Sequence, residues 1–307
     1  MRKLNIKKLF ASSVLAIALV CAPNLSANAA QVTEKAEKTQ KAVSAEESRI
    51  ALPSGSQRTD LVVNGRSVLS GRVFTLSGVT YVPMIKFASW LGVFDQSNSV
   101  SNGIRKSSIT GKNLKIEAVE NNLYISANDR YFYTVGEILE IGGELYVPIY
   151  PLVKALNCYV TYNSATGAYN VRSGDTSRLP ASSKIYREDE VYWLARIISA
   201  EARGESFKGK IAVGNVILNR VRSNLFPNTI YSVIFDRKYG VQFSPILNGS
   251  IYQTPTEESI IAAKVCLEGY SLSNEILYFV NPKAAPDSWI SKNRVHSFTV
   301  GNHAFYK

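Results

Sequence analysis

Residues 190–205 read Glu-Val-Tyr-Trp-Leu-Ala-Arg-Ile-Ile-Ser-Ala-Glu-Ala-Arg-Gly-Glu and carry the clearest structural pattern in this 307-residue chain. Apolar side chains recur at steps of three and four residues, which predicts an amphipathic helix from Glu190 to Ala202. Gly204 follows at the position where a glycine commonly ends a helix. Glu201 lies at the edge of the apolar stripe, so we expect its carboxyl group to be partly shielded from water.

Shielding from water favours the neutral form of a carboxyl group and raises its pKa. A carboxylic acid that keeps its proton near neutral pH can protonate a glycosidic oxygen. Glu201 is therefore a candidate general acid. The alternative is a structural ion pair, because Arg203 or Arg220 could neutralise the same carboxylate.

A second helix is predicted over Lys208–Val221, where apolar residues again recur at helical spacing. Gly214 lies inside it, although glycine within a helix is unfavourable by about 1 kcal/mol relative to alanine. Close contact between the two helices would explain this glycine. Glu201 would then lie at the seam between them.

Residues 1–30 have the features of a signal peptide. A basic start precedes an apolar run over residues 9–22, and Ala27-Asn28-Ala29 supplies the small residues that signal peptidase needs. The run is too short to span a membrane, and no later segment is long and apolar enough to be transmembrane. We therefore expect a secreted protein.

Two further segments separate the rest of the chain into domains. Residues 31–58 are rich in Lys, Glu, Ser, Ala and Gln and contain no aromatic residue, which predicts a flexible spacer. The Gly, Pro and Ser content of residues 172–185 marks a linker. Residues 59–171 and 186–307 are then two domains of ordinary size, and the predicted fold class is α+β.

The first domain contains an internal repeat. Gly78–Gly92 (GVTYVPMIKFASWLG) returns as Gly143–Asn157 (GELYVPIYPLVKALN). In each copy a short strand ends at Tyr-Val-Pro, and an amphipathic helix follows with proline at its start. The pattern predicts a small α+β domain with two strand–helix units.

These residues resemble the domain named after the N-terminal part of copper amine oxidase, which is common in secreted proteins of Gram-positive bacteria. The resemblance implies an accessory or binding module associated with the cell wall. A structural spacer domain is the alternative. Copper is not predicted, because the segment has no histidine and only Cys158 as a soft ligand.

Blocks of residues in the second domain follow one another in a specific order. They are Leu194–Glu205, Gly209–Val221, Phe226–Ile230, Val241–Pro245, Tyr278–Pro282, Trp289 and Gly301–Phe305. Several long blocks in order are far more specific than one short motif. They resemble the spore cortex-lytic enzymes, a family of cell wall hydrolases involved in spore germination. The resemblance implies an α-rich, lysozyme-like catalytic domain with a small β region, acting on peptidoglycan of the spore cortex or cell wall.

The same resemblance implies that Glu201 is the catalytic residue of a lytic transglycosylase. One glutamate would act as acid toward the leaving oxygen of the MurNAc-β-1,4-GlcNAc bond and then as base toward the muramoyl C6 hydroxyl group. Attack by water would instead make the enzyme a muramidase. A second carboxylate would come from Glu205, Asp236 or Asp287, although a solvated loop acid is the simpler interpretation of Glu205.

The motif match also assigns substrate contacts, because aromatic faces stack on sugar rings and amides bind their substituents. The predicted contacts are Gln242, Phe243, Tyr278, Asn281 and Trp289. Core packing is the alternative for Phe243 and Trp289. The supporting candidates are Glu205, Arg220, Asn302 and His303.

No cofactor or metal site is predicted. His296 and His303 are the two histidines of the chain, and their spacing is not that of metal ligands, which disfavours a zinc peptidase or amidase. Cys266 lies on an apolar helical run over Ile260–Leu267 and is better interpreted as a core residue than as a nucleophile. Cys158 and Cys266 alone do not make a disulfide framework.

The formal net charge is +11, of which four charges belong to the predicted signal peptide. The remaining excess suits an anionic wall polymer, and no Lys/Arg stripe with interleaved aromatic residues indicates nucleic acid. Peptidoglycan is thus the predicted partner, in association with the cell wall or spore cortex. The alternative to an enzyme is a non-catalytic peptidoglycan-binding or spore-assembly protein.

Overall fold

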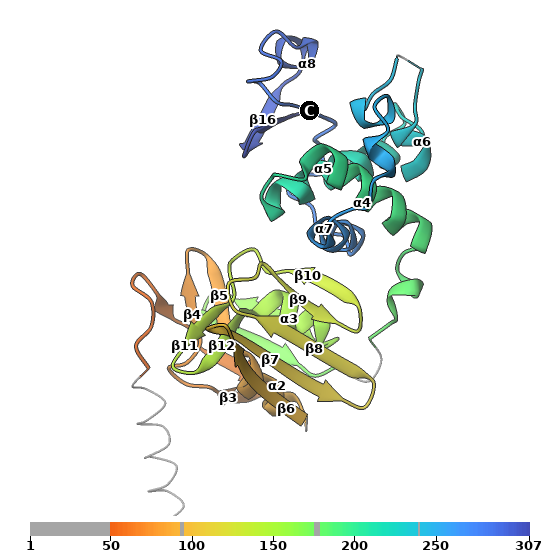
Figure 1. Ribbon diagram of the computed structural model, residues 1–307. Coiled ribbons are helices and arrows are strands. Elements are labelled where there is room, and N and C mark those ends of the chain that lie inside the picture. The colour runs from red at the N-terminus through yellow and green to blue at the C-terminus, as the bar shows by residue number, and fades with distance from the viewer. Residues whose placement is uncertain (1–49, 93–94, 175–178, 239) are drawn as a thin grey trace, which may run out of the picture. The chain divides into compact units, whose positions relative to one another are not determined.

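The computed structural model describes residues 50–92, 95–174, 179–238 and 240–307. The predicted signal peptide over 1–30 and most of the predicted spacer over 31–58 lie outside these residues. Within the described part, strands dominate the N-terminal region and helices the C-terminal region (Figure 1). The α+β class is therefore confirmed.

The described N-terminal region contains three β-sheets (Figure 1). A five-stranded antiparallel sheet has the order β1 (Gln57–Arg58), β4 (Phe74–Leu76), β5 (Val79–Pro83), β12 (Glu144–Pro148) and β11 (Leu139–Ile141). A second antiparallel sheet has the order β10 (Arg130–Tyr133), β9 (Tyr124–Ala127), β8 (Leu114–Val119), β7 (Ile104–Gly111) and β6 (Asp95–Ser101). The third consists of β13 (Tyr159–Asn163), β14 (Ala168–Arg172), β2 (Leu61–Val63) and β3 (Arg66–Val68), with β14 and β2 parallel.

Both copies of the sequence repeat adopt the predicted strand–helix structure. Strand β5 leads into α2 (Met84–Leu91), and β12 leads into α3 (Ile149–Ala155). Pro83 and Pro148 are the N-caps of these helices, where the missing N–H of proline costs no helical hydrogen bond. Gly92 caps the end of α2, and Asn157 follows α3 with a φ of 51°. The two repeats meet because β5 and β12 pair directly.

Sequence reasoning missed much of the β structure between the repeats. Strands β6 to β11 all lie there, and every residue of β6 is exposed, so hydrophobic alternation gives no signal for that strand. Gln57 and Arg58, the last two residues of the predicted spacer, form β1 and pair with β4.

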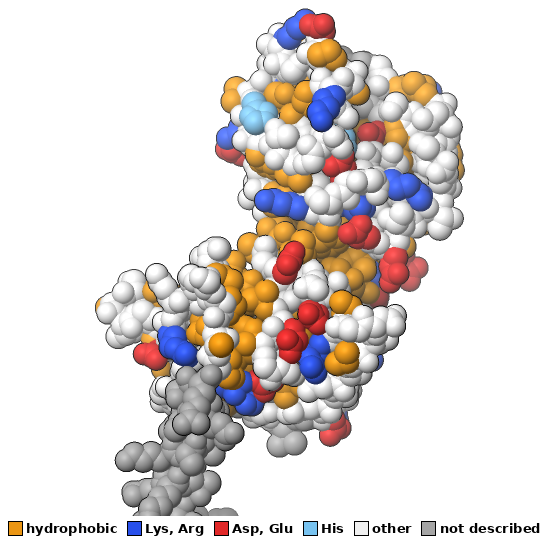
Figure 2. All heavy atoms as spheres, turned by 60° about the vertical axis from the view of Figure 1, so that its left-hand side comes forward, with side chains coloured by type: hydrophobic (Ala, Val, Ile, Leu, Met, Phe, Trp, Pro, Cys, Tyr) orange, Lys and Arg blue, Asp and Glu red, His pale blue; other side chains and the backbone are white. Residues whose placement is uncertain are grey.

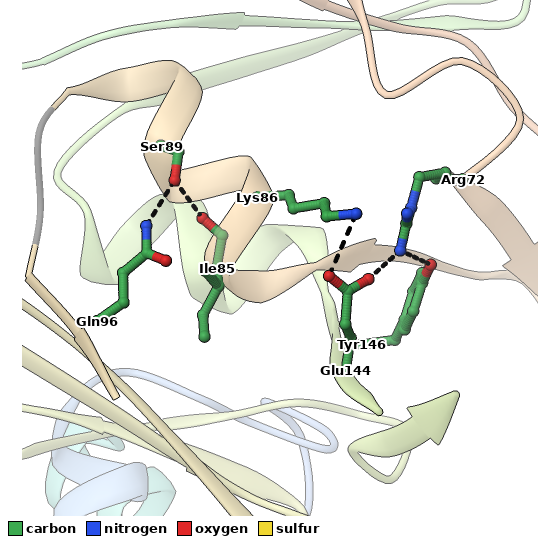
Figure 3. Close-up of polar contacts among 7 residues, drawn as sticks. All are labelled: Arg72, Ile85, Lys86, Ser89, Gln96, Glu144 and Tyr146. Carbon is green, nitrogen blue, oxygen red and sulfur yellow. Dashed lines mark hydrogen bonds and ion pairs between the residues drawn. The ribbon is translucent and has the colours of Figure 1, made fainter. Parts of the chain in front are cut away.

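Polar side chains fix α2 against the five-stranded sheet (Figure 3). The Arg72 side chain is buried and donates hydrogen bonds to Glu144 and, at 3.3 Å, to the Tyr146 hydroxyl group. The Lys86 ammonium group of α2 lies 3.4 Å from the other carboxylate oxygen of Glu144. A buried cation needs an opposite charge and hydrogen bonds to offset its desolvation, and Glu144 with Tyr146 supplies both.

Helices dominate the C-terminal region, and most of them were predicted. They are α4 (Glu188–Ala202), α5 (Phe207–Arg222), α6 (Ile230–Ile234), α7 (Glu257–Leu267) and α8 (Trp289–Asn293). A small antiparallel sheet has the order β15 (Tyr278–Val280), β17 (His303–Tyr306) and β16 (His296–Val300). The helices predicted over 190–202 and 208–221 are confirmed as α4, which starts two residues earlier, and α5, which is one residue longer at each end.

The end of α4 differs in detail from the prediction. Arg203 is the C-cap, with a φ of −52°, and Gly204 does not adopt the left-handed conformation of a typical glycine cap. The chain turns through a backbone hydrogen bond from the Glu205 amide to the Ala202 carbonyl oxygen at 3.0 Å. Ser206 then begins α5 by accepting a hydrogen bond from the Gly209 amide.

Gly214 allows the close helix contact that its position predicted. A Cβ atom there would lie 2.8 Å from Cys266 Sγ and 2.9 Å from Ile198 Cδ1. Those atoms belong to α7 and α4, so both helices approach the α5 backbone at this glycine. The contact fixes the helix that carries Glu201.

Separate hydrophobic cores form within residues 61–171 and within residues 194–305, and Tyr133 joins the second. Arg130 donates to both carboxylate oxygens of Glu268 at 2.7 and 2.6 Å, and both side chains are buried. Residues from Glu47 to Lys307 group as one compact unit. The domain limits at 59–171, 172–185 and 186–307 stay a prediction.

No helix among the described residues combines the length and the apolar character needed to cross a bilayer. On the face drawn in Figure 2, Lys and Arg side chains are interspersed with Asp and Glu side chains. The positive charge of this face is thus spread over its surface.

Candidate active site

A groove with a cavity volume of about 1100 Å³ lies in the C-terminal region. Its walls come from α4, α5, the loops before and after η3 (Ser244–Ile246), β15, α8 and β17. Glu201 and His303 both line it. Segments from the two ends of the C-terminal region therefore meet at one site.

Glu201 lines the groove from the last turn of α4. Burial raises the pKa of Glu201 to about 7, and no charged neighbour among the described residues contributes to the shift. Arg203 donates instead to the Thr254 carbonyl oxygen at 2.9 Å, and Arg220 donates from Nε to the Leu277 carbonyl oxygen at 2.7 Å. The carboxyl group can thus hold or release a proton near neutral pH.

Arg220 forms part of the groove wall on α5 and is 5% exposed. Its guanidinium carbon lies 4.8, 5.3 and 5.5 Å from the ring centroids of Phe226, Phe243 and Tyr278. Burial lowers the pKa of Arg220 to about 10, although Tyr278 and Asp236 oppose the shift. Arg220 therefore stays protonated at neutral pH, enclosed mainly by aromatic rings.

All five predicted substrate contacts line this groove: Gln242, Phe243, Tyr278, Asn281 and Trp289. Two of them differ sharply in exposure. Phe243 is 3% exposed and belongs to the hydrophobic core, so it packs the fold as well as bordering the groove. Trp289 is 59% exposed, which excludes the core-packing alternative for this residue. Its ring can stack on a sugar.

Arg294 was not predicted, although it joins two of the predicted contacts. Its guanidinium carbon lies 4.6 Å from the Tyr278 ring centroid and 4.9 Å from that of Trp289. Leu225 and Leu247 also line the groove with exposed side chains. These residues lie in loops or after a short helix, where no periodic pattern marks their role.

Glu205 and Asn302, predicted as supporting residues, bind each other and are not among the groove-lining residues. The Glu205 carboxylate accepts hydrogen bonds from Asn302 Nδ2 at 3.0 Å and from the Asn302 amide at 3.2 Å. Burial alone would raise the pKa of Glu205, but the hydrogen bonds from Asn302, together with the charges of His303 and Lys210, outweigh it and lower the pKa. Glu205 is thus a loop acid, as interpreted from the sequence, and Asn302 holds its carboxylate in place.

His303 follows Asn302 at the start of β17 and lines the groove with 8% of its surface exposed. Burial lowers the pKa of His303, while the Glu205 carboxylate opposes the shift. Among the described residues, its Nδ1 atom has no hydrogen-bond partner. Glu205 thus holds the hairpin that brings a buried imidazole into the groove.

The remaining carboxylate candidates differ in position. Asp236 lines the groove and accepts a hydrogen bond from the Lys238 amide at 2.9 Å. Asp287 is not among the lining residues and pairs with Lys292 at 2.9 Å. Asp236 is therefore the candidate that shares the groove with Glu201.

The described residues contain no cluster of three or more His, Cys, Asp or Glu side chains that could hold a metal ion. Cys158 and Cys266 are both free. Cys266 is 1% exposed, and burial raises the pKa of its thiol, so the prediction of a core residue is confirmed. Cys158 is partly buried.

Comparison with known proteins gives the family of this region. The sequence profile of the cell wall hydrolase family matches residues 204–306. Cell wall hydrolase CwlJ of Oceanobacillus iheyensis is 31% identical over 128 residues, which are 39% of this chain and 88% of the relative. The chain belongs to the cell wall hydrolase family. The resemblance predicted for the C-terminal half is thus confirmed, and the likeness of residues 59–171 to the copper amine oxidase domain stays a prediction.

Other relatives are longer proteins of the same family. A spore cortex-lytic enzyme of Bacillus cereus is 36% identical over 122 residues, covering 40% of this chain and 46% of the relative. That of Bacillus subtilis is 36% identical over 120 residues, covering 39% and 38%. This chain thus spans less than half the length of both. The catalytic domain of the germination-specific lytic transglycosylase SleB from Bacillus anthracis is 35% identical, covering 40% of this chain and 97% of that one, with a TM-score of 0.37.

Proposed function

We propose that this member of the cell wall hydrolase family cleaves the glycan strands of peptidoglycan, in the spore cortex or cell wall, with Glu201 as its acid and base. The observation that carries the proposal is a groove-lining carboxyl group whose pKa burial raises to about 7. Such a group is protonated often enough at neutral pH to donate to a leaving oxygen. The names of the relatives, a spore cortex-lytic enzyme and a germination-specific lytic transglycosylase, support the same substrate.

The reaction we propose is that of a lytic transglycosylase at the MurNAc-β-1,4-GlcNAc bond. The Glu201 carboxylic acid gives its proton to the glycosidic oxygen as the bond to the muramoyl anomeric carbon breaks. The resulting carboxylate takes the proton of the muramoyl C6 hydroxyl group, whose oxygen forms the new bond to that carbon. The product carries a 1,6-anhydro ring, and Glu201 regains its proton.

Substrate binding in this proposal uses the two sides of the groove. Trp289 and Tyr278 offer ring faces to the sugars, and Gln242 and Asn281 offer amide groups. Asp236 lines the groove as well, so it is the residue to test if water rather than the C6 hydroxyl group attacks.

The rest of the chain would bring the enzyme to its substrate. We infer that residues 1–30 direct secretion and that residues 59–171, which resemble a wall-associated module, hold the enzyme on peptidoglycan. The positive net charge favours adsorption to an anionic wall.

The decisive experiment is digestion of purified sacculi and of spore cortex, followed by mass spectrometry of the fragments. The wild type should release 1,6-anhydro ends, and Glu201→Gln should release none above background. Glu188→Gln is the matched control, because Glu188 lies on the same helix and is exposed at its start. Equal fragment yields from Glu201→Gln would contradict the assignment. Binding to sacculi without any release of fragments by the wild type would favour the non-catalytic alternative.

A further inference from the structure

The groove wall contains two buried polar atoms that the protein itself leaves without a partner. Among the described residues, neither Arg220 Nη1 nor His303 Nδ1 has a hydrogen bond, and both residues line the groove. Each of these residues has less than a tenth of its surface exposed. Buried polar groups in folded proteins are almost always paired, so an unpaired donor beside a ligand groove suggests that the ligand completes it.

Arg220 is held in place for such a role. Its Nε atom donates to the Leu277 carbonyl oxygen at 2.7 Å, which fixes one edge of the guanidinium group. Phe226, Phe243 and Tyr278 surround the cation and restrict its movement. The Nη atoms of the planar guanidinium group thus keep their orientation before any ligand arrives. Little side-chain entropy of Arg220 then remains to be lost on binding.

The chemistry of the site indicates which acceptor Arg220 would meet. Arg220 interacts electrostatically with Asp236, which lines the same groove, so a nearby negative charge already balances the guanidinium group in part. Asp236 would repel a second anion, whereas an uncharged carbonyl oxygen meets no such penalty. Peptidoglycan glycan offers amide carbonyl groups on both of its amino sugars, on the N-acyl substituents and at the lactyl group.

We propose that Arg220 donates a hydrogen bond from its unpaired Nη edge to an amide carbonyl oxygen of the bound amino sugar. Arg220 is then a substrate-binding residue that makes the groove selective for acylated glycan. This inference rests on the proposed function, because it takes peptidoglycan as the ligand. It adds a specificity determinant that the acid–base chemistry of Glu201 does not require.

Binding measurements on the full chain test the inference without turnover. The Glu201→Gln protein and its double variant with Arg220→Gln are titrated calorimetrically with soluble glycan fragments. The fragments are intact, de-N-acetylated, chemically re-acetylated, or stripped of stem peptide by an amidase. A pH of about 9 keeps Arg220 charged, since its pKa is about 10. The exposed amines are then mostly neutral, as for an α-amino group with a pKa of about 7.7–8.0.

Removal of the carbonyl group that Arg220 binds should weaken binding of the fragment to the Glu201→Gln protein, which retains Arg220, by about tenfold or more. This is the loss expected for a hydrogen bond to a charged donor. Re-acetylation should restore binding if the N-acyl group is the acceptor. If only the amidase-treated fragments bind more weakly, the acceptor is the lactyl carbonyl group. In Arg220→Gln the discrimination should fall to within about twofold, whereas Arg222→Gln, an exposed arginine at the end of the same helix, should keep it.

If the double variant with Arg220→Gln still discriminates fully between intact and modified fragments, the inference is wrong and the proposed function is unaffected. If the Glu201→Gln protein, which retains Arg220, binds no fragment at all, the proposed substrate is contradicted as well. Circular dichroism and thermal melting check that the variants are folded. If Arg220→Gln fails to fold, Arg220→Lys keeps the charge but loses the planar fork and should show reduced discrimination.

Discussion

Glu201 and Glu205 lie four residues apart in one motif, and their surroundings move their pKa values in opposite directions. Burial at the end of α4 raises the pKa of Glu201 to about 7. Hydrogen bonds from Asn302 lower the pKa of Glu205 despite its partial burial. The same side chain is therefore suited to proton transfer in one place and to holding a hairpin in the other. The burial and hydrogen-bond partners of each carboxyl group decide its role, and closeness in the sequence does not.

The largest expected difference between the two is in the rate of glycan cleavage. Glu201→Gln should lower the rate by about 10²–10⁴-fold, the usual contribution of a general acid–base group. Glu205→Gln should lower it by about tenfold or less, because that carboxylate acts through the position of His303. Fragment release from sacculi measures both rates. Equal losses in the two variants would remove the distinction between the residues.

The pH dependence of cleavage should separate the two carboxyl groups. The acid form of Glu201 starts the reaction, so the rate should fall about tenfold per pH unit above pH 7. The Glu205 carboxylate loses its hydrogen bonds when protonated, so a second decline should occur below its ordinary value of 4.5. Rates on soluble fragments, measured from pH 9 down to well below 4.5, test this, and the decline on the acidic side should be absent in Glu205→Gln.

The free energy of unfolding should change in opposite directions for Glu201→Gln and Glu205→Gln. Folded Glu201 keeps its proton up to about pH 7, whereas the unfolded chain releases it near 4.5, so folding stability falls between these values. The Glu201→Gln variant has no ionisable group at this position. Its free energy of unfolding at pH 8 should therefore exceed that of the wild type by on the order of 1–3 kcal/mol.

Glu205 has a lowered pKa, so it contributes stability above its ordinary value that disappears as the pH falls through the folded value. Glu205→Gln should therefore be less stable at pH 8, by about 1 kcal/mol after allowance for solvent screening. Urea unfolding of both variants at pH 8 gives the two signs. Changes of the same sign would contradict the assigned surroundings.

The smallest effect is expected from Gly301→Ala, which disturbs the hairpin and displaces the Glu205 carboxylate without replacing either glutamate. A Cβ atom there would lie 1.9 Å from Glu205 Oε2, and the φ of 57° disfavours alanine. The variant should lose about 1 kcal/mol of folding stability and resemble Glu205→Gln in its pH profile. Gly204→Ala is the control, since a Cβ atom at Gly204 would meet nothing within 4 Å.

The parts of the site that depend on local pattern could be predicted from sequence. Helical periodicity predicts the positions of α4 and α5 and makes Glu201 a candidate acid, and the family resemblance then selects Glu201 over the ion-pair alternative. The Tyr-Val-Pro repeat likewise predicts both strand–helix units. In each case the signal lies within about fifteen residues.

Contacts between distant segments could not be predicted in this way. The hydrogen bonds between Glu205 and Asn302 join residues 97 positions apart, and no local pattern encodes them. The exposure of Trp289 against the burial of Phe243 also depends on which loops cover each ring. Strand β6 lacks an apolar face altogether, so pairing with β7 defines it.

Cys266 gives the helical core an intrinsic reporter. Its thiol lies against Gly214 and donates to the Ile211 carbonyl oxygen at 3.5 Å, so an alkylating reagent reaches it only when α7 separates from α5. The half-buried Cys158 offers a faster-reacting internal reference in the same chain. The ratio of the two labelling rates would follow transient opening of the helices behind the groove without any engineered probe.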